Sequence, residues 1–557
     1  DVDNYDPSLF TIDMFNADEL LNDGNSYVSY YGFDHTGKIL DYRPSIDDFF
    51  TQRDEFGNFT RPIGAFEPIY MAGYISDKFA FRDLIFNIGL RVDRFDANQS
   101  VLSDPYLLFP AKTVKEVNDL GEHPGNMGDN FVVYVNDLKN PTAVAGYRDG
   151  FVWYDATGTE ISDPSVIETA SGIAPYLVDP DDDVVSSKAF KDYDPQISLM
   201  PRISFSFPIS DEALFFAHYD VLTKRPTTGN RLDPTDYLFI YQMGQNPLNN
   251  PNLKPEKTID YELGFQQLLN IRSSLKFSAY YREMRDLVQI YRFSGSYPTS
   301  YISYNNIDFG TVKGMTIAYD LRRSNNVWIK ANYTLQFADG TGSNSSSALT
   351  LVRTGQPNLR TLTPLNFDRR HAVTAVVDYR FSSGSKYNGP KITRQIKGTD
   401  KVKTIALLEN TGANFTFRGG SGIPYSKSSK VVGTYASGGD YLLEGSINGS
   451  RLPWQFTIDA RIDKDIEMKF GQNKEKTAYI NVYLQVLNVL NTENIMGVYR
   501  ATGNPDDDGY LSAAEYQAQI NAQTSPESYR QLYSLIVNSP YNYSLPRRIR
   551  LGVMFSF

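Results

Sequence analysis

The 557-residue chain contains no cysteine, which excludes a disulfide-stapled scaffold, a zinc–thiolate site and a cysteine nucleophile. It also lacks any apolar run that approaches the ~18 residues needed by a membrane-spanning helix. Positive charge is in deficit, with 54 Lys and Arg against 65 Asp and Glu, so nucleic acid is not expected as a partner. No Pro/Gly/Ser-rich linker divides the chain. A chain this long without a linker favours one large β architecture over several small domains.

Alternation of apolar and polar residues is the strongest positive signal. In residues 452–470 every second side chain from Leu452 to Phe470 is apolar, except Lys464, and the residues between them are polar or charged. Side chains alternate between the two faces of a strand, so one face is apolar and the other charged. At ~3.3 Å per residue this strand approaches about 60 Å, which is long for a strand of a globular protein.

The same pattern recurs along the chain, and the connections between its segments differ in length. Short turns are expected near Phe81 and at 209–211, 270–272, 324–325 and 471–474; connection 384–403 should be short by this rule and is not. Short turns that alternate with long loops are typical of outer-membrane barrels. The long connections are 97–195, 224–255, 287–302, 339–368, 419–451 and 491–544. About thirteen segments alternate, near 67–80, 82–96, 196–209, 212–223, 256–268, 273–286, 303–322, 326–338, 369–383, 404–418, 452–470, 475–490 and 545–557.

The expected fold class is therefore all-β, a transmembrane antiparallel β-barrel with long extracellular loops. Bacterial single-chain barrels have an even number of strands, so an odd count indicates about 13–14 strands of a larger barrel. Residues 1–66 are then an extracellular loop segment that follows missing upstream strands, and residues 67–557 are the C-terminal part of the barrel. The missing barrel and plug portion would be upstream sequence or another chain, because open strand edges in lipid leave backbone groups unsatisfied. The alternative is a miscount by one strand.

Several motifs carry a family resemblance. The ending Leu545–Phe557 places an aromatic residue last on the apolar face, which resembles the terminal strand of outer-membrane proteins. The order of the internal motifs resembles the TonB-dependent transporter family, and the segment Ala72–Asp93 is most similar to its Oar-type branch. The internal motifs are Asn250-Pro-Asn-Leu-Lys-Pro-Glu256, Ile259-Asp-Tyr-Glu-Leu-Gly-Phe265, Tyr280-Tyr-Arg-Glu-Met-Arg-Asp-Leu287, Asn305-Asn-Ile-Asp-Phe-Gly-Thr-Val-Lys-Gly314, Asp368-Arg-Arg-His371 and Val486-Leu-Asn-Val-Leu-Asn491.

The resemblance implies a barrel of about 22 strands with an internal plug, in the outer membrane of a Gram-negative bacterium. It implies TonB-dependent active transport of a bulky substrate such as a peptide, a glycan or a metal chelate. The implied partners are outer-membrane lipid, the TonB complex through the missing N-terminal region, and a surface lipoprotein or protein substrate. An alternative is a structural or secretion-complex barrel that anchors surface partners through its loops, and a third is a secreted soluble all-β protein.

The connection 491–544 contains an EF-hand-like pattern, Asn504-Pro-Asp-Asp-Asp-Gly-Tyr-Leu-Ser-Ala-Ala-Glu515. Oxygen donors at positions 1, 3, 5, 7, 9 and 12 with glycine at position 6 are the Ca²⁺-binding arrangement of that loop. A bound Ca²⁺ would rigidify the loop, and the alternative is an acidic surface loop that turns at Gly509. The predicted metal ligands are Asn504, Asp506, Asp508, Tyr510, Ser512 and Glu515.

Two aromatic clusters in the loops have two interpretations. Tyr237–Tyr241 and Tyr297–Tyr304 are either part of the interfacial girdle and loop packing or a substrate-facing surface. The sequence does not assign substrate-binding residues. It shows no nucleophile elbow, Walker loop or dinucleotide fingerprint in the required context, so no enzymatic activity is expected.

Overall fold

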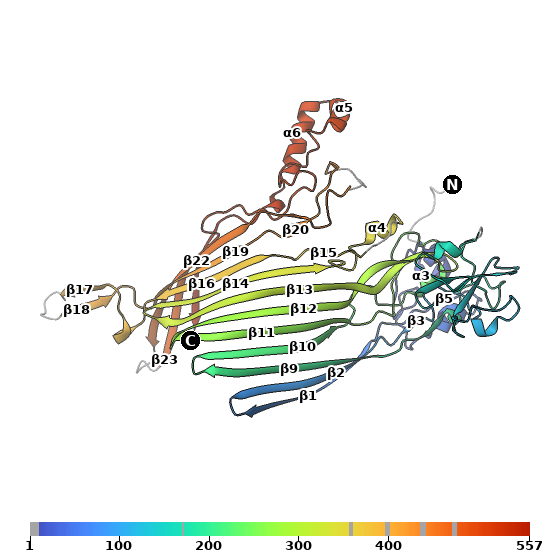
Figure 1. The fold of residues 1–557 in the computed structure, drawn as a ribbon. Coiled ribbons are helices and arrows are strands. Elements are labelled where there is room, and N and C mark those ends of the chain that lie inside the picture. The colour runs from blue at the N-terminus through green and yellow to red at the C-terminus, as the bar shows by residue number, and fades with distance from the viewer. Residues whose placement is uncertain are drawn as a thin grey trace.

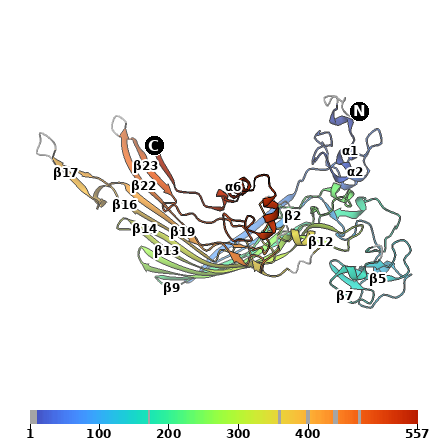
Figure 2. The ribbon, with the colours of Figure 1, turned by 90° about the horizontal axis from the view of Figure 1, so that it is seen from above.

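The computed structural model describes residues 10–169, 172–355, 360–395, 402–434, 442–470 and 476–556. Within them one antiparallel sheet of 14 strands dominates the chain (Figure 1). Its strands follow the order β1-β2-β9-β10-β11-β12-β13-β14-β16-β19-β22-β23-β24, and β15 pairs with β14. Each strand therefore lies beside the next long strand of the sequence, as in an up-and-down barrel wall. Figure 2 shows that the sheet is curved.

The predicted strands are confirmed almost everywhere, and the all-β fold with them. Two predicted bounds differ by seven residues. At 404–418 the sheet strand begins only at Thr411, because residues 402–406 pair in a separate hairpin. The predicted long connection 287–302 is wrong, because β12 continues to Phe293 and β13 begins at Tyr301, which leaves a short connection. The predicted turn at 471–474 lies outside the described residues. The sheet strands are β1 (Ile69–Phe81), β2 (Leu84–Asp96), β9 (Gln196–Ser210), β10 (Ala213–Lys224), β11 (Glu256–Asn270), β12 (Ser273–Phe293), β13 (Tyr301–Ser324), β14 (Val327–Gly340), β15 (Thr363–Pro364), β16 (His371–Arg380), β19 (Thr411–Gly420), β22 (Gln455–Phe470), β23 (Lys476–Leu487) and β24 (Arg548–Ser556).

The sheet has an apolar face outward and a polar face inward. On β22, Ile462 is 51% exposed and Ile466 is 43% exposed, whereas Asp463 between them is 6% exposed. Arg380 on β16 holds Asp463, with Nη2 2.7 Å from Oδ2. Exposed apolar side chains on alternate positions of many strands are the surface that lipid covers in an outer-membrane barrel. No helix in the described part of the chain is long and apolar enough to cross a membrane.

Short turns gather at one end of the sheet, where they join β1 to β2, β9 to β10, β11 to β12 and β13 to β14. Asn325 and Asn326 in the last of these have φ of 48° and 77°, the left-handed conformation that a two-residue hairpin turn requires. The connection from β16 to β19 lies at this end but is longer. It folds into a hairpin of β17 (Lys391–Gln395) and β18 (Val402–Ala406) that projects beyond the turns (Figure 1).

The long connections lie at the opposite end, the loop end, and carry their own small elements. Segment 97–195 contains a four-stranded sheet, β4-β5-β6-β7, and the pair β3-β8. Segment 491–544 contains two helices. These elements are α1 (Ala17–Leu21), α2 (Ile46–Thr51), α3 (Pro234–Leu238), α4 (Leu349–Arg353), α5 (Gln517–Asn521), α6 (Pro526–Val537), β3 (Ser100–Leu102), β4 (Val132–Val135), β5 (Val144–Asp149), β6 (Val152–Asp155), β7 (Glu160–Ile161), β8 (Phe190–Asp192), β20 (Pro424–Tyr425) and β21 (Ser450–Arg451).

A hydrophobic core lies at the loop end and includes Phe293 and Tyr301 at the ends of β12 and β13. It joins Leu21 and Phe49 of segment 10–66 to Tyr106 of segment 97–195 and to Tyr237 of α3. Segment 10–66 contributes no strand to the large sheet. Its assignment to an extracellular loop, and of residues 67–557 to a C-terminal barrel portion, stays a prediction.

Candidate functional site

The strands β12 and β13 build the centre of the loop end. They are 21 and 24 residues long, and their pairing continues to Phe293 opposite Tyr301. The register shifts between Met284 and Val288, where Asp286 has φ of 57°. A bulge of this kind increases the local twist and re-aims the side chains that follow. Beyond it, Phe293 is 1% exposed, because the loops now pack against the extended pair.

Five aromatic residues form a packed group, here called the aromatic wall. The rings of Phe293 and Tyr301 stack with centroids 4.9 Å apart, and Tyr106 meets Phe293 edge-on at 5.4 Å. Tyr106 also contacts Trp153 of β6 at 5.3 Å. Offset and edge-on contacts of this kind each contribute about 0.5–1.5 kcal/mol beyond burial. The wall consists of Tyr106, Trp153, Tyr291, Phe293 and Tyr301.

A cavity of about 1270 Å³ lies against the aromatic wall, and it is the largest among those described. Tyr237 and Tyr301 both line it, so the structure brings one residue of each predicted aromatic cluster to the same place. Tyr297 instead packs edge-on against Phe109, 5.7 Å between centroids. The polar and charged residues that line the cavity include Asn252, Lys254, Asp286, Arg292, Asn305, Asn306, Arg360, Glu160 and Asp163.

The sequence reasoning missed the part of this lining that comes from segment 97–195. Tyr106, Phe151 and Trp153 line the cavity from connection 97–195, for which the sequence predicts only a long loop. The signal that could have found them is the aromatic-rich stretch 147–154, YRDGFVWY, inside that connection. Phe151 is 53% exposed, and it is the most accessible aromatic ring of the lining.

Two of the motifs that carry the family resemblance supply asparagine side chains, Asn250 and Asn306, that hold the backbone at the cavity in place. Asn306 accepts a hydrogen bond from the backbone N–H of Lys254 at 2.8 Å and donates Nδ2 to the carbonyls of Lys254 and Asp286 at 3.0 and 2.7 Å. Asn250 donates Nδ2 to the carbonyl of Tyr304 at 2.8 Å. These amides satisfy backbone groups that the strand ladder leaves free at the bulge. The asparagine side chains of these two motifs therefore position the lining. Their amide groups are occupied by these hydrogen bonds to the backbone.

Charged groups stand behind the lining. Arg148 is 2% exposed and donates Nε to the hydroxyl of Tyr134 at 2.8 Å, while its Nη2 bonds Asp104. Its guanidinium lies 4.8 Å from the ring centroid of Tyr106, so it supports the wall from the rear.

In α3, burial and the neighbouring Asp233 raise the pKa of Asp236 to about 7. Asp233 itself accepts a hydrogen bond from the hydroxyl of Tyr31 at 2.7 Å.

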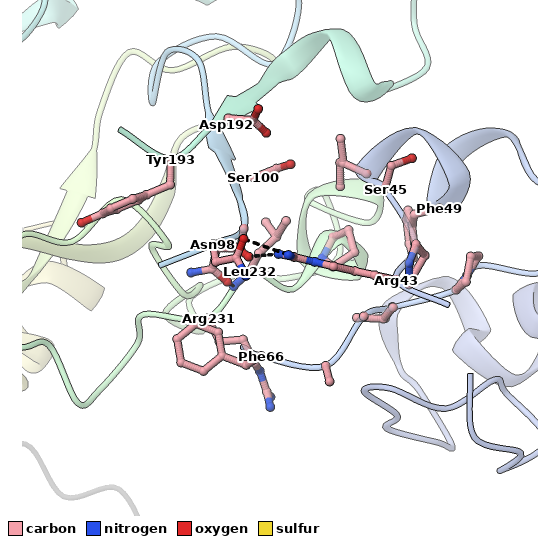
Figure 3. A pocket seen from close by; sticks show the side chains of 18 of the residues that line it. Arg43, Ser45, Phe49, Phe66, Asn98, Ser100, Asp192, Tyr193, Arg231 and Leu232 are labelled. Carbon is pink, nitrogen blue, oxygen red and sulfur yellow. Dashed lines mark hydrogen bonds between the residues drawn. The ribbon is translucent and has the colours of Figure 1, made fainter. Parts of the chain in front are cut away.

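A second cavity, of about 550 Å³, separates segment 10–66 from the sheet (Figure 3). Arg43 reaches across it and donates Nη1 to Oδ1 of Asn98 at 2.8 Å. Arg231 lies on the other side, with its guanidinium 3.3 Å from the ring centroid of Tyr31. The lining of this second cavity combines side chains of both charges with prolines and apolar side chains. It lies between segment 10–66 and the loops, and no single type of side chain dominates it.

The residues of the predicted Ca²⁺ loop lie in the described part of the chain. Gly509 makes the expected turn with φ of 83°, but Asp508 is buried and accepts hydrogen bonds from the hydroxyls of Tyr533 and Thr434 at 2.5 and 3.0 Å. Asn504, Asp506, Ser512 and Glu515 are exposed. Among the described residues, no group of three or more His, Cys, Asp or Glu side chains is gathered for a metal. Calcium binding at 504–515, including the backbone carbonyl of Tyr510, stays a prediction.

Comparison with solved structures gives matches of low sequence identity. The FrpB iron transporter from Neisseria meningitidis is 12% identical with a TM-score of 0.36, over 77% of this chain and 42% of that one. The Serratia marcescens hemophore receptor HasR, in complex with its hemophore HasA and heme, is 11% identical with a TM-score of 0.39, over 77% and 49%. The transporter YddB from Escherichia coli is 13% identical with a TM-score of 0.38, over 80% and 54%. The chain thus spans about half the length of these proteins or less.

Comparison with curated proteins gave no match. The sequence profile described as TonB dependent receptor-like, beta-barrel matches residues 2–489, which is most of the chain. The match covers β1 through β23, together with the loop-end cavity and the two asparagine side chains, Asn250 and Asn306, that hold its backbone. The chain belongs to the TonB-dependent receptor-like β-barrel family.

Proposed function

We propose that this chain captures the substrate of a TonB-dependent active transporter in the outer membrane of a Gram-negative bacterium. The observation that carries the proposal is the 1270 Å³ cavity at the loop end of a sheet whose outer face is apolar. Long loops of such barrels face the cell exterior, so the cavity meets external solutes first. Energy would arrive from the inner membrane through TonB, and displacement of a plug would open the lumen. Both of those parts belong to the family and not to the residues described.

The cavity suits a bulky polar substrate. Its volume exceeds the roughly 300–1,000 Å³ of common small-molecule sites. Exposed rings such as Phe151 offer flat apolar contact, while Arg292, Lys254 and Asp163 offer both signs of charge. A peptide, a glycan or a metal chelate combines flat or apolar groups with polar ones and fits this lining.

The test is energised uptake by cells that carry the full-length protein. Labelled oligopeptides, oligosaccharides and ferric chelates are offered separately, and accumulation is measured with and without a protonophore. We expect Phe151→Ala to lower accumulation of one class about two- to tenfold, because a stacked ring contributes about 0.5–1.5 kcal/mol to contact. The matched control is Phe56→Ala, since Phe56 is 81% exposed at the loop end and lies outside the cavity lining. Accumulation that persists with the protonophore present would refute energised transport.

A second candidate function rests on helix α6. Leu532, Leu535 and Ile536 are 62%, 73% and 42% exposed on one face, while Tyr533 and Val537 pack inward. An exposed apolar stripe on a loop-end helix marks a protein contact, as an anchor for a surface lipoprotein would need. Leu535→Glu should then release a surface protein that co-purifies with the barrel and leave uptake by the energised cells unchanged. Loss of uptake in that variant would instead assign the stripe to transport.

A further inference from the structure

The hairpin β17–β18 projects from the turn end of the sheet and is held at its base by hydrogen bonds. The turn end faces the periplasm in outer-membrane barrels. Tyr387 at its base is 5% exposed, donates its hydroxyl to the carbonyl of Pro390 at 2.6 Å and accepts the N–H of Leu408 at 3.1 Å. Lys464 of β22 donates Nζ to the carbonyl of Leu407 at 2.8 Å. The hairpin therefore leaves the sheet in a defined direction.

The backbone of this hairpin is only half paired. β17 and β18 pair with each other from Lys391 opposite Ala406 to Gln395 opposite Val402, and neither pairs with another strand that the structure describes. Two-stranded hairpins alone are marginally stable in water. Free strand edges are templates for a further strand, and natural proteins normally protect them. Both outer edges of this hairpin are thus open to a partner.

One face of the hairpin combines an apolar pair with a cationic pair. Ile392 lies opposite Ile405, and the two are 48% and 42% exposed. Two residues further along, Arg394 lies opposite Lys403, and both are exposed. Like charges directly opposite each other destabilise a strand pair. Neither side chain forms an ion pair with any residue that the structure describes.

The wider charge balance points the same way. Lys386 and Lys391 are also exposed, and the described residues from 384 to 408 include no acidic side chain. The whole chain has a net charge of −11, so this cationic patch opposes the overall sign. The pair Arg394 and Lys403 destabilises the hairpin, and it lies beside an open strand edge and an exposed apolar pair. This arrangement is complementary to an acidic segment in which an apolar residue lies two positions from the acidic one.

We infer that β17–β18 is a docking element for an acidic, extended segment of a periplasmic protein, which adds to the hairpin as a third strand. Main-chain hydrogen bonds along the open edge supply affinity, and alternate side chains supply specificity. The added strand pairs with the outer edge of β17, so that its glutamate or aspartate lies beside Arg394, with Lys403 one strand further on the same face. An apolar residue two positions away lies beside Ile392, with Ile405 one strand further. A lipid headgroup matches the charge but not the open backbone edge.

The test uses the purified chain in detergent and a labelled nine-residue peptide that alternates threonine with valine and glutamate, so that valine and glutamate lie two residues apart on one face. We expect saturable binding that weakens about tenfold or more in R394E/K403E, because the direct cross-strand contact with residue 394 and the longer-range attraction to residue 403 both become repulsive. The control K386E/K391E makes the same change of charge away from this face, and it should bind as the unaltered chain does. A peptide with lysine for glutamate should show the reverse preference and bind R394E/K403E.

A variant that cannot weaken the hairpin keeps the result interpretable. Arg394→Glu alone creates an attractive pair with Lys403, so the hairpin gains stability while the peptide should still bind less tightly. Equal weakening by R394E/K403E and K386E/K391E would show general charge attraction and overturn the inference. Binding to phosphatidylglycerol vesicles, but not to the peptide, would assign the hairpin to the membrane surface and overturn it as well.

Discussion

Replacing Phe293 by alanine should loosen the loop end without disturbing the sheet. Phe293 is 1% exposed and its ring meets those of Tyr301, Tyr291 and Tyr106 at 4.9, 5.0 and 5.4 Å. Deleting a buried phenylalanine costs about 3–5 kcal/mol, part of which is the cavity left behind. The aromatic contacts are included in that loss. The cost falls on the extended β12–β13 pair and the loops that pack against it.

The effect is local, so the assay must be local. Amide hydrogen exchange reports the free energy of opening at each segment. The useful reporters are the N–H of Tyr297, which donates to the carbonyl of Tyr106 at 2.9 Å, and the N–H of Leu248, which donates to Ile302 at 2.8 Å. A loss of about 3 kcal/mol accelerates exchange by opening roughly 100-fold at these amides. Amides of β22 and β23 should be unchanged.

Phe151→Ala is the matched control, because it removes a ring from the same lining. Phe151 is 53% exposed, so its removal leaves little new cavity and should cost less than about 1 kcal/mol. Its exchange profile should match that of the unaltered chain while substrate uptake falls. Unchanged protection of Tyr297 and Leu248 in Phe293→Ala would refute the view that the aromatic wall holds the loops in place.

Two further predictions concern charged groups at the loop end. The pKa of Asp236, raised to about 7 by burial and Asp233, means that the folded loop holds a proton that the unfolded loop releases near pH 4. Loop stability is therefore fully present below about pH 4 and falls by up to about 4 kcal/mol as the pH rises to about 7. Asp236→Asn should make amide exchange of residues 231–250 independent of pH after correction for intrinsic rates, and a persisting dependence would contradict this origin. Calcium at about 1 mM should slow proteolysis within 504–515, and Glu515→Gln should abolish that protection. Asp508 already accepts hydrogen bonds from Tyr533 and Thr434. If calcium gives no protection, these hydrogen bonds are favoured over the metal and the calcium prediction is wrong.

The sheet was predictable because its side chains obey a period of two. In β22 the alternation from Trp454 to Phe470 defines which face meets lipid, and a one-residue slip would invert every side chain. Turn positions followed from where the alternation breaks, as at Asn325 and Asn326. The start of β19 was misplaced because apolar residues continue upstream of it, from Ile405 to Leu408, into β18. Periodicity alone does not say which partner a strand takes.

The loop end was not predictable in the same way. Tyr106 and Trp153 lie 47 positions apart in connection 97–195, Phe293 lies at the end of β12, and no periodicity links them. The pattern at 504–515 matches a metal loop by spacing, yet the fold directs Asp508 toward Thr434, 74 residues earlier in the chain. Spacing along the chain constrains local geometry only. Which distant donors reach a carboxylate depends on how the loops pack.

The sequence by itself determined the strands, their order, the face each turns to lipid and the family, because these depend on local alternation and on motifs read along the chain. Only the tertiary structure decided where the aromatic wall, the 1270 Å³ cavity and the exposed hairpin β17–β18 lie. Those features depend on contacts between segments far apart in the chain. The physical reason is that a strand's faces follow from its own residues, whereas a cavity is enclosed by residues of several segments at once.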